Sequence, residues 1–201
     1  MAGDGSTHIR DDVLWFLDTT FAAWNWAHKS MRDAVKNLTA SEPAWQPSRH
    51  THSVREQINH VAHWKAYVGQ RLRGRRPRAH QAWPASGRTA RDLRRSIAHL
   101  GRLHDELRKT VLDMAPDTFA RSRIGRYSTV QLLLGAAAHE SYHAGQILLT
   151  RKLYRDSRRP PADRGRGAAL RPASRPVPPP PSASTPDAPP RTRRSRRRAG
   201  G

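Results

Sequence analysis

The chain of 201 residues contains no cysteine. Disulfide bridges, thiolate zinc sites and a catalytic thiol are therefore excluded. The chain also lacks a run of about 18 apolar residues, the length that a membrane-spanning helix requires. Its first residues, MAGDGSTHIRDD, have no apolar segment of the kind found in secretory signals. We therefore expect no membrane span and a cytoplasmic location.

A β-sheet pattern is missing too, because no run of β-branched residues repeats with a period of two. Apolar residues instead recur at intervals of three and four, as they do on one face of a helix. The four predicted helices span residues 7–38, 53–73, 89–114 and 128–153. Four such helices in about 150 residues favour an all-α fold, a four-helix bundle.

The predicted helices carry recognisable start signals. Ser53 with Glu56, and Ser128 with Gln131, match the capping box, in which two side chains satisfy backbone donors of the first turn. Thr89 with Asp92 has the same character. The last helix is apolar on all sides, which predicts a central position. The stripe of the first helix comprises Leu14, Leu17, Phe21, Trp24, His28, Met31, Val35 and Leu38.

Positive charge and proline gather at the end of the chain. The formal net charge is +21, and residues 155–201 hold 13 Arg, 3 Asp and 11 of the 16 Pro. Such a segment cannot bury enough apolar surface to offset the entropy of ordering it, so we predict a disordered tail over 155–201 after a domain over 1–154. Its arginines are either a nucleic-acid-binding element or a solvated tail with nonspecific affinity.

Two of the eleven histidines stand out. His139 and His143 are four positions apart on the most hydrophobic helix, so their side chains differ by about 40° in direction and about 6 Å along the axis. They could converge on one ion at metal–nitrogen distances of about 2.0–2.1 Å. The spacing alone leaves metal binding and ordinary core packing equally open. His28 and His104, which interrupt apolar stripes, are predicted to be hydrogen-bonded core or pocket histidines.

A third ligand would have to come from another helix, and residues 53–73 offer His60 and His63. His63 points away from the aliphatic stripe, which predicts a solvated side chain. His60 lies beside Trp64 at the edge of an aromatic face, so periodicity favours His60 without deciding the matter. Glu56, one turn earlier, is either an acceptor for an imidazole N–H or, the preferred interpretation, only the cap partner of Ser53.

Two segments resemble motifs of a known family. AWQPSRHTHSVREQINHVAHWKAYVGQRLRG resembles the second-helix motif of the DinB-like (DinB/YfiT) family, and YSTVQLLLGAAAHESYHAGQILLTRKLY resembles its closing motif. The resemblance spans about residues 13–154. It implies an up-down-down-up four-helix bundle that holds a divalent ion, zinc or nickel, with His60, His139 and His143 as ligands. One departure is His52, since many members have Trp at that position.

The resemblance also implies a chemistry. Some proteins of this family resemble transferases that use a low-molecular-weight thiol, mycothiol or bacillithiol, and others resemble thiol-dependent isomerases. An ion held by three imidazoles is a Lewis acid that can hold a thiolate at neutral pH. The expectation is a metal-dependent thiol S-transferase with a small-molecule substrate. Candidates for binding an anionic substrate are Arg55, Arg71 and Arg126, although solvated surface is the default interpretation of each.

Two alternatives remain at this stage. A metal-dependent hydrolase would need a general base, for which Glu140 or Glu56 could serve. A non-catalytic, metal-stabilised bundle could bind nucleic acid through its basic tail. The sequence assigns no catalytic or cofactor-binding residue, and a homodimer through the outer faces of the bundle is compatible with it but specified by no residue.

Overall fold

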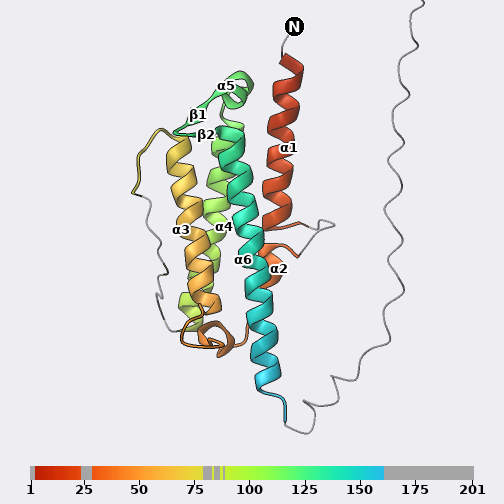
Figure 1. Ribbon diagram of the computed structural model, residues 1–201, viewed down its shortest axis with the longest axis vertical. Coiled ribbons are helices and arrows are strands. Elements are labelled where there is room, and N and C mark those ends of the chain that lie inside the picture. Colours follow the sequence, from red (N-terminus) through yellow and green to blue (C-terminus); the bar gives the residue numbers. More distant parts are fainter. Residues whose placement is uncertain (1–2, 24–28, 79–82, 84–86, 88, 161–201) are drawn as a thin grey trace, which may run out of the picture. The chain divides into compact units, whose positions relative to one another are not determined.

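Four long helices dominate the computed structural model, which describes residues 3–23, 29–78, 83, 87 and 89–160. Figure 1 shows two of them, α1 and α6, running in one direction and the other two, α3 and α4, in the opposite direction. This all-α arrangement confirms the predicted bundle. The long helices are α1 (Gly3–Phe21), α3 (Val54–Leu72), α4 (Ala90–Leu112) and α6 (Thr129–Ser157).

The four helices close a ring, in which α3 contacts α4 and α6, and α1 contacts the same two helices from the other side. Two apolar clusters fill the interior. One surrounds Ile58, Leu100 and Ile147, and the other surrounds Leu17 and Leu133. Burying side chains of this size stabilises the fold by roughly 1.5–3 kcal/mol each. Most of the residues that the three- and four-residue intervals placed on the inner faces of α3 and α4 are buried.

The predicted starts of the other three long helices are also confirmed, whereas α1 begins at Gly3 rather than near residue 7. Capping boxes close the first turns of α3 at Ser53, of α4 at Thr89 and of α6 at Ser128. The end of α6 lies at Ser157, beyond the predicted end at residue 153. The predicted tail lies outside the described residues from 161 onward, so its disorder and the proposed domain boundary stay predictions.

The prediction of one continuous helix over 7–38 is wrong. The chain forms α1 and then a separate short helix, α2 (Met31–Val35). The physical reason is a capping box that the sequence analysis overlooked: Ser30 has extended backbone dihedral angles, and its side chain and that of Asp33 cap each other's backbone N–H groups. Trp24 and His28, which were placed on the first stripe, lie outside the described residues.

Short elements between the long helices were not predicted either. They include a 3-10 turn, a short helix and a two-stranded hairpin, so the expectation that the chain has no sheet is wrong at this one place. The strands are too short for a period of two to be visible. Their turn contains Gly125 with a positive φ of 67°. The elements are η1 (Glu42–Ala44), α5 (Pro116–Arg121), β1 (Arg123–Ile124) and β2 (Tyr127–Ser128).

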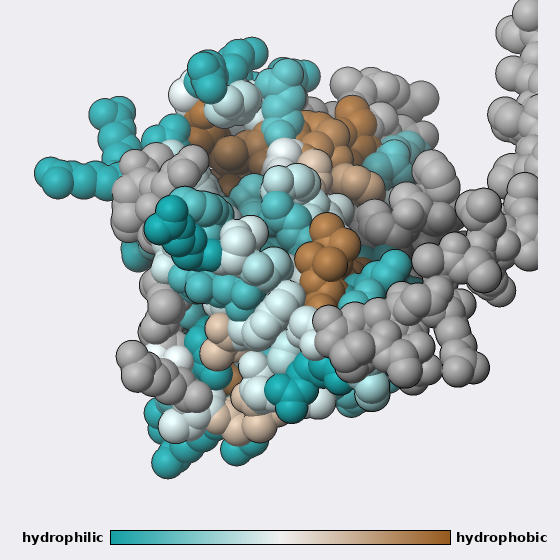
Figure 2. Space-filling view, turned by 60° about the horizontal axis from the view of Figure 1, so that its bottom comes forward, coloured by the Kyte–Doolittle hydropathy of each residue, from teal (hydrophilic) through white to brown (hydrophobic). Residues whose placement is uncertain are grey.

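The outer faces of the described helices mix polar and apolar side chains. Figure 2 shows hydrophobic side chains in separate patches among hydrophilic ones. Among the described residues, no helix combines the length and the hydrophobicity that a bilayer-spanning segment needs. The large exposed hydrophobic residues are Ile9, Trp15, Leu112, Tyr127, Leu134, Tyr142, Leu149 and Leu153.

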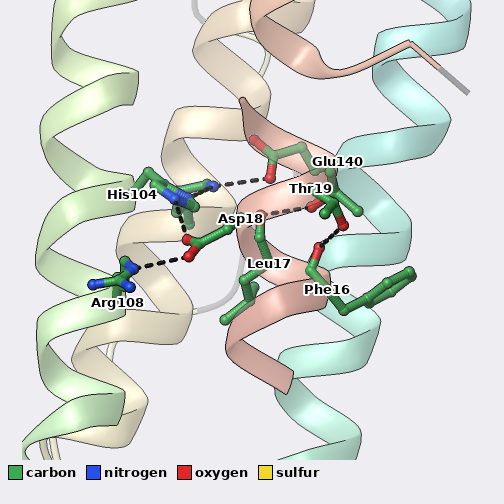
Figure 3. Close-up of polar contacts among 9 residues, drawn as sticks. Phe16, Leu17, Asp18, Thr19, His104, Arg108 and Glu140 are labelled. Carbon is green, nitrogen blue, oxygen red and sulfur yellow. Dashed lines mark hydrogen bonds and ion pairs between the residues drawn. The ribbon is translucent and has the colours of Figure 1, made fainter. Parts of the chain in front are cut away.

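A chain of polar contacts crosses the interior and links all four long helices. Nζ of Lys65 lies 2.9 Å from Oε2 of Glu140 and 3.2 Å from Nδ1 of His104. From α1, Asp18 reaches Nε2 of His104 at 3.1 Å and Nε of Arg108 at 2.9 Å (Figure 3). His104 is thus a hydrogen-bonded core histidine, as predicted.

His104 generates a prediction about acid stability. Burial and the charge of Lys65, opposed by Asp18 and Asp105, lower the pKa of His104 to about 4. An unfolded histidine titrates near pH 6.5, so between these values the unfolded chain binds more protons, and stability falls as the pH falls. We expect His104→Gln, which keeps a donor and an acceptor, to make this loss shallower by up to about 1.4 kcal/mol per pH unit.

The measurement is urea unfolding at several pH values between 4 and 7. His99→Gln is the matched control, because His99 is exposed on the same helix. Parallel pH profiles for the wild type and His104→Gln would show that the buried imidazole does not control acid stability.

Candidate metal centre

Three histidines converge on the seam between α3 and α6. Nε2 of His139 lies 3.2 Å from Nε2 of His60 and 3.1 Å from Nε2 of His143. The candidate ligand atoms of the three residues all lie within 4.8 Å of one another. His139 and His143 are brought together by their four-residue spacing on α6, and His60 is brought to them by the antiparallel packing of α3 against α6. The group could hold a metal ion.

The three Nε2 atoms cannot all be paired with one another by hydrogen bonds. A neutral imidazole has one N–H donor and one acceptor nitrogen. Nε2 of His139 faces the Nε2 atoms of both His60 and His143, and it can serve only one of them well, either as a donor or as an acceptor. A single cation between the nitrogens would accept a lone pair from each ring, so the donor set fits a divalent ion of the zinc type.

The electrostatics keep these rings ready to act as ligands. Burial, reinforced by the charge of His60, lowers the pKa of His139 to about 4. Burial and the neighbouring His139 and His60 likewise lower the pKa of His143 to about 4. Both imidazoles are therefore neutral at pH 7, the form that binds a metal.

A tryptophan ring stacks on the imidazole of His60. The rings of Trp83 and His60 stack with centroids 3.8 Å apart, and the opposite face of Trp83 stacks on His52 at 3.5 Å. The interplanar angles are only 5° and 3°. Sequence reasoning missed Trp83, because it lies in the connection between α3 and α4, where no periodicity marks a role. His52 was noted only as a departure from the family pattern.

Two cavities meet at this centre, and His139 and Trp83 line both. The first, which we call the Gln146 cavity, has a volume of about 540 Å³. The second, the Arg126 cavity, has a volume of about 640 Å³. The Gln146 cavity is lined by residues that include His50, His52, Gln57, Tyr142, His143, Gln146 and Leu149. The Arg126 cavity is lined by residues that include His60, Trp64, Lys65, Tyr67, Arg126, Tyr127 and Leu132.

The other candidate ligands and bases on these helices lie elsewhere. His63 is half-buried with its ring against Trp64, so the prediction of a solvated side chain is wrong. Glu56 accepts from the backbone and side chain of Ser53, at 2.7 Å each, which confirms the cap interpretation. Glu140 points into the bundle toward Lys65; burial raises its pKa, and the charge of Lys65 opposes that rise.

The structure separates the three candidate arginines. Arg55 is buried, donates to the backbone oxygen of Thr89 and lines neither cavity at the centre. Arg71 lies against the hairpin turn: its Nη2 is 3.2 Å from the position that a Cβ on Gly125 would occupy. Arg126 is the one of the three that lines a cavity at the histidines.

Comparison with known proteins gives one finding. A family model described as the DinB superfamily matches residues 23–147, a range that includes the first sequence motif, most of the second and all three histidines. No curated protein and no solved structure matches the chain.

Proposed function

This chain belongs to the DinB superfamily, and on that premise we propose that it is a metal-dependent S-transferase acting with a low-molecular-weight thiol of the mycothiol or bacillithiol type. His60, His139 and His143 would hold one divalent ion, zinc or nickel. The observation that carries the proposal is the convergence of these three rings at the point where two cavities meet.

The ion, when bound, supplies the Lewis acidity that keeps a thiol sulfur deprotonated at neutral pH. His139 and His143 are neutral and can each offer a nitrogen lone pair, since their low pKa values keep protons off them. Trp83 stacks on His60 and limits the rotation of its ring. The sulfur would come from the small-molecule thiol, because the chain has no cysteine of its own.

A transfer reaction brings two reactants to one centre, and the arrangement of the cavities supports it. The Gln146 cavity and the Arg126 cavity share Trp83 and His139, so a ligand in either one can reach the histidines. Each volume falls in the range of small-molecule sites, about 300–1,000 Å³. One cavity would hold the thiol and the other the molecule to which its sulfur is transferred.

The hydrolase alternative receives less support. Of its two candidate bases, Glu56 caps α3 and Glu140 is paired with Lys65 inside the bundle. Among the described residues that line the two cavities there is no Asp or Glu. A carboxylate general base would have to move into the site, whereas transfer of a thiolate needs none.

The first test concerns the metal. We expect the purified protein to carry about one divalent ion per chain and His60→Ala to lose it, because removing one of three ligands costs more than the 10–100-fold loss in affinity typical of residues that only orient a ligand. Elemental analysis of protein prepared without added metal measures the content. His63→Ala, on the same helix, is the matched control. Equal metal content in the wild type and His60→Ala would contradict the site.

The second test concerns the reaction. With mycothiol or bacillithiol and 1-chloro-2,4-dinitrobenzene, sulfur forms a bond to the ring carbon, chloride leaves, and the thiol proton passes to solvent. We expect the metal-loaded protein to accelerate this conjugation and His143→Ala to abolish at least nine-tenths of the acceleration, which absorbance of the thioether records. A protein that binds metal, accelerates neither thiol reaction and instead cleaves a nitrophenyl ester would favour the hydrolase.

A further inference from the structure

We propose that the Arg126 cavity binds a flat, apolar molecule that carries one carboxylate, with the guanidinium of Arg126 as the anion-binding group. The proposal rests on the proposed function, because it names the class of the second reactant. It also makes a claim about binding that can be tested without turnover.

The walls of the Arg126 cavity are built from rings and aliphatic side chains. Trp64 and Tyr67 come from α3, Leu132 from α6, and Trp83 and Tyr127 from the connections between helices. Flat apolar groups bind well between such side chains, because ring faces and edges offer large contact areas. The Gln146 cavity differs in charge, since no Lys or Arg is among its described lining residues, whereas Lys65 and Arg126 line the Arg126 cavity.

Positive charge at the hairpin end of this cavity is available for a ligand. Arg126 donates from Nη2 to the hydroxyl of Tyr127 at 2.6 Å, and its guanidinium lies 4.9 Å from the centre of that ring. No carboxylate in the described part of the chain forms an ion pair with Arg126. Lys65, the other cation of the lining, is already paired with Glu140 at 2.9 Å.

A second arginine adds positive charge at the hairpin end of the Arg126 cavity. Arg71 lies against Gly125, the residue before Arg126. A guanidinium can bind a carboxylate through two parallel hydrogen bonds, which a neutral group of the same shape cannot reproduce. The site therefore favours an anion over its uncharged analogue.

The length of the cavity sets the size of the ligand. Gln131, near the hairpin, and His139 both line it. Eight residues of helix separate them, a rise of about 12 Å. A carboxylate bound at Arg126 and a reacting atom at the histidines would thus be spanned by a molecule of about two fused or linked rings.

Biphenyl-4-carboxylate has this size and charge, and biphenyl-4-carboxamide is its neutral analogue. We expect calorimetric titration of the purified full-length protein to show at least tenfold tighter binding of the carboxylate. Arg126→Gln should remove that preference by weakening carboxylate binding at least tenfold, while binding of the amide stays within twofold. Arg121→Gln, which alters an exposed arginine on α5, is the matched control and should behave as the wild type.

Equal affinities for the two ligands in the wild type, or an unchanged preference in Arg126→Gln, would overturn the proposal. The same titrations on His143→Ala separate it from the proposed function, because His143 is a candidate metal ligand that does not line the Arg126 cavity. A carboxylate preference that persists when metal and thiol transfer are lost confirms a cavity that selects anions by Arg126 rather than through the ion. Metal binding and thiol transfer without any carboxylate preference would refute the cavity proposal alone.

Discussion

The buried ion pair between Lys65 and Glu140 joins the two helices that carry the three imidazoles. It lies five residues after His60 on α3 and one residue after His139 on α6, so it fixes how these helices slide and rotate against each other at the level of the site. Removing one partner of such a pair leaves an uncompensated buried charge and costs about 3–5 kcal/mol. The contact to His104 extends this constraint to α4, and Asp18 extends it to α1.

Much of this arrangement was readable in the sequence, for reasons that differ by element. Capping boxes and apolar intervals placed α3, α4 and α6, because both signals act within one helix. The break after α1 was missed, since the apolar intervals continue through residues 31–38 and only the pairing of Ser30 with Asp33 shows that a new helix starts there. The histidine set followed from the spacing on α6 together with a family resemblance, whereas periodicity alone left His60 and His63 both open.

Trp83 and the hairpin escaped prediction for a shared physical reason: both lie in connections between the long helices, where no helical period marks the contacts of a residue. Trp83 is placed by stacking on His52 and His60, which lie on either side of the start of α3, and nothing in its own neighbours announces that role. In the hairpin, Gly125 adopts a left-handed conformation that turns the chain, and the side chain of Arg126 contacts that of Tyr127. No feature of the sequence marks this contact. The ring of His52 likewise stacks on a tryptophan that comes from a different segment of the chain.

The helices hold the ring nitrogens and the connections form part of the cavity walls, so these two parts of the site can vary separately within the superfamily. The ring nitrogens sit on two regular helices whose register a buried ion pair fixes, so a change in a connection leaves the donor set in place. The cavity walls come partly from those connections, in Trp83, Arg126 and Tyr127. Of these, Arg126 and Tyr127 are exposed and can change without disturbing the core. One set of imidazoles can therefore serve different substrates. In this chain the charge at Arg126 and the rings beside it favour an apolar anion, a preference that the helices alone would not create.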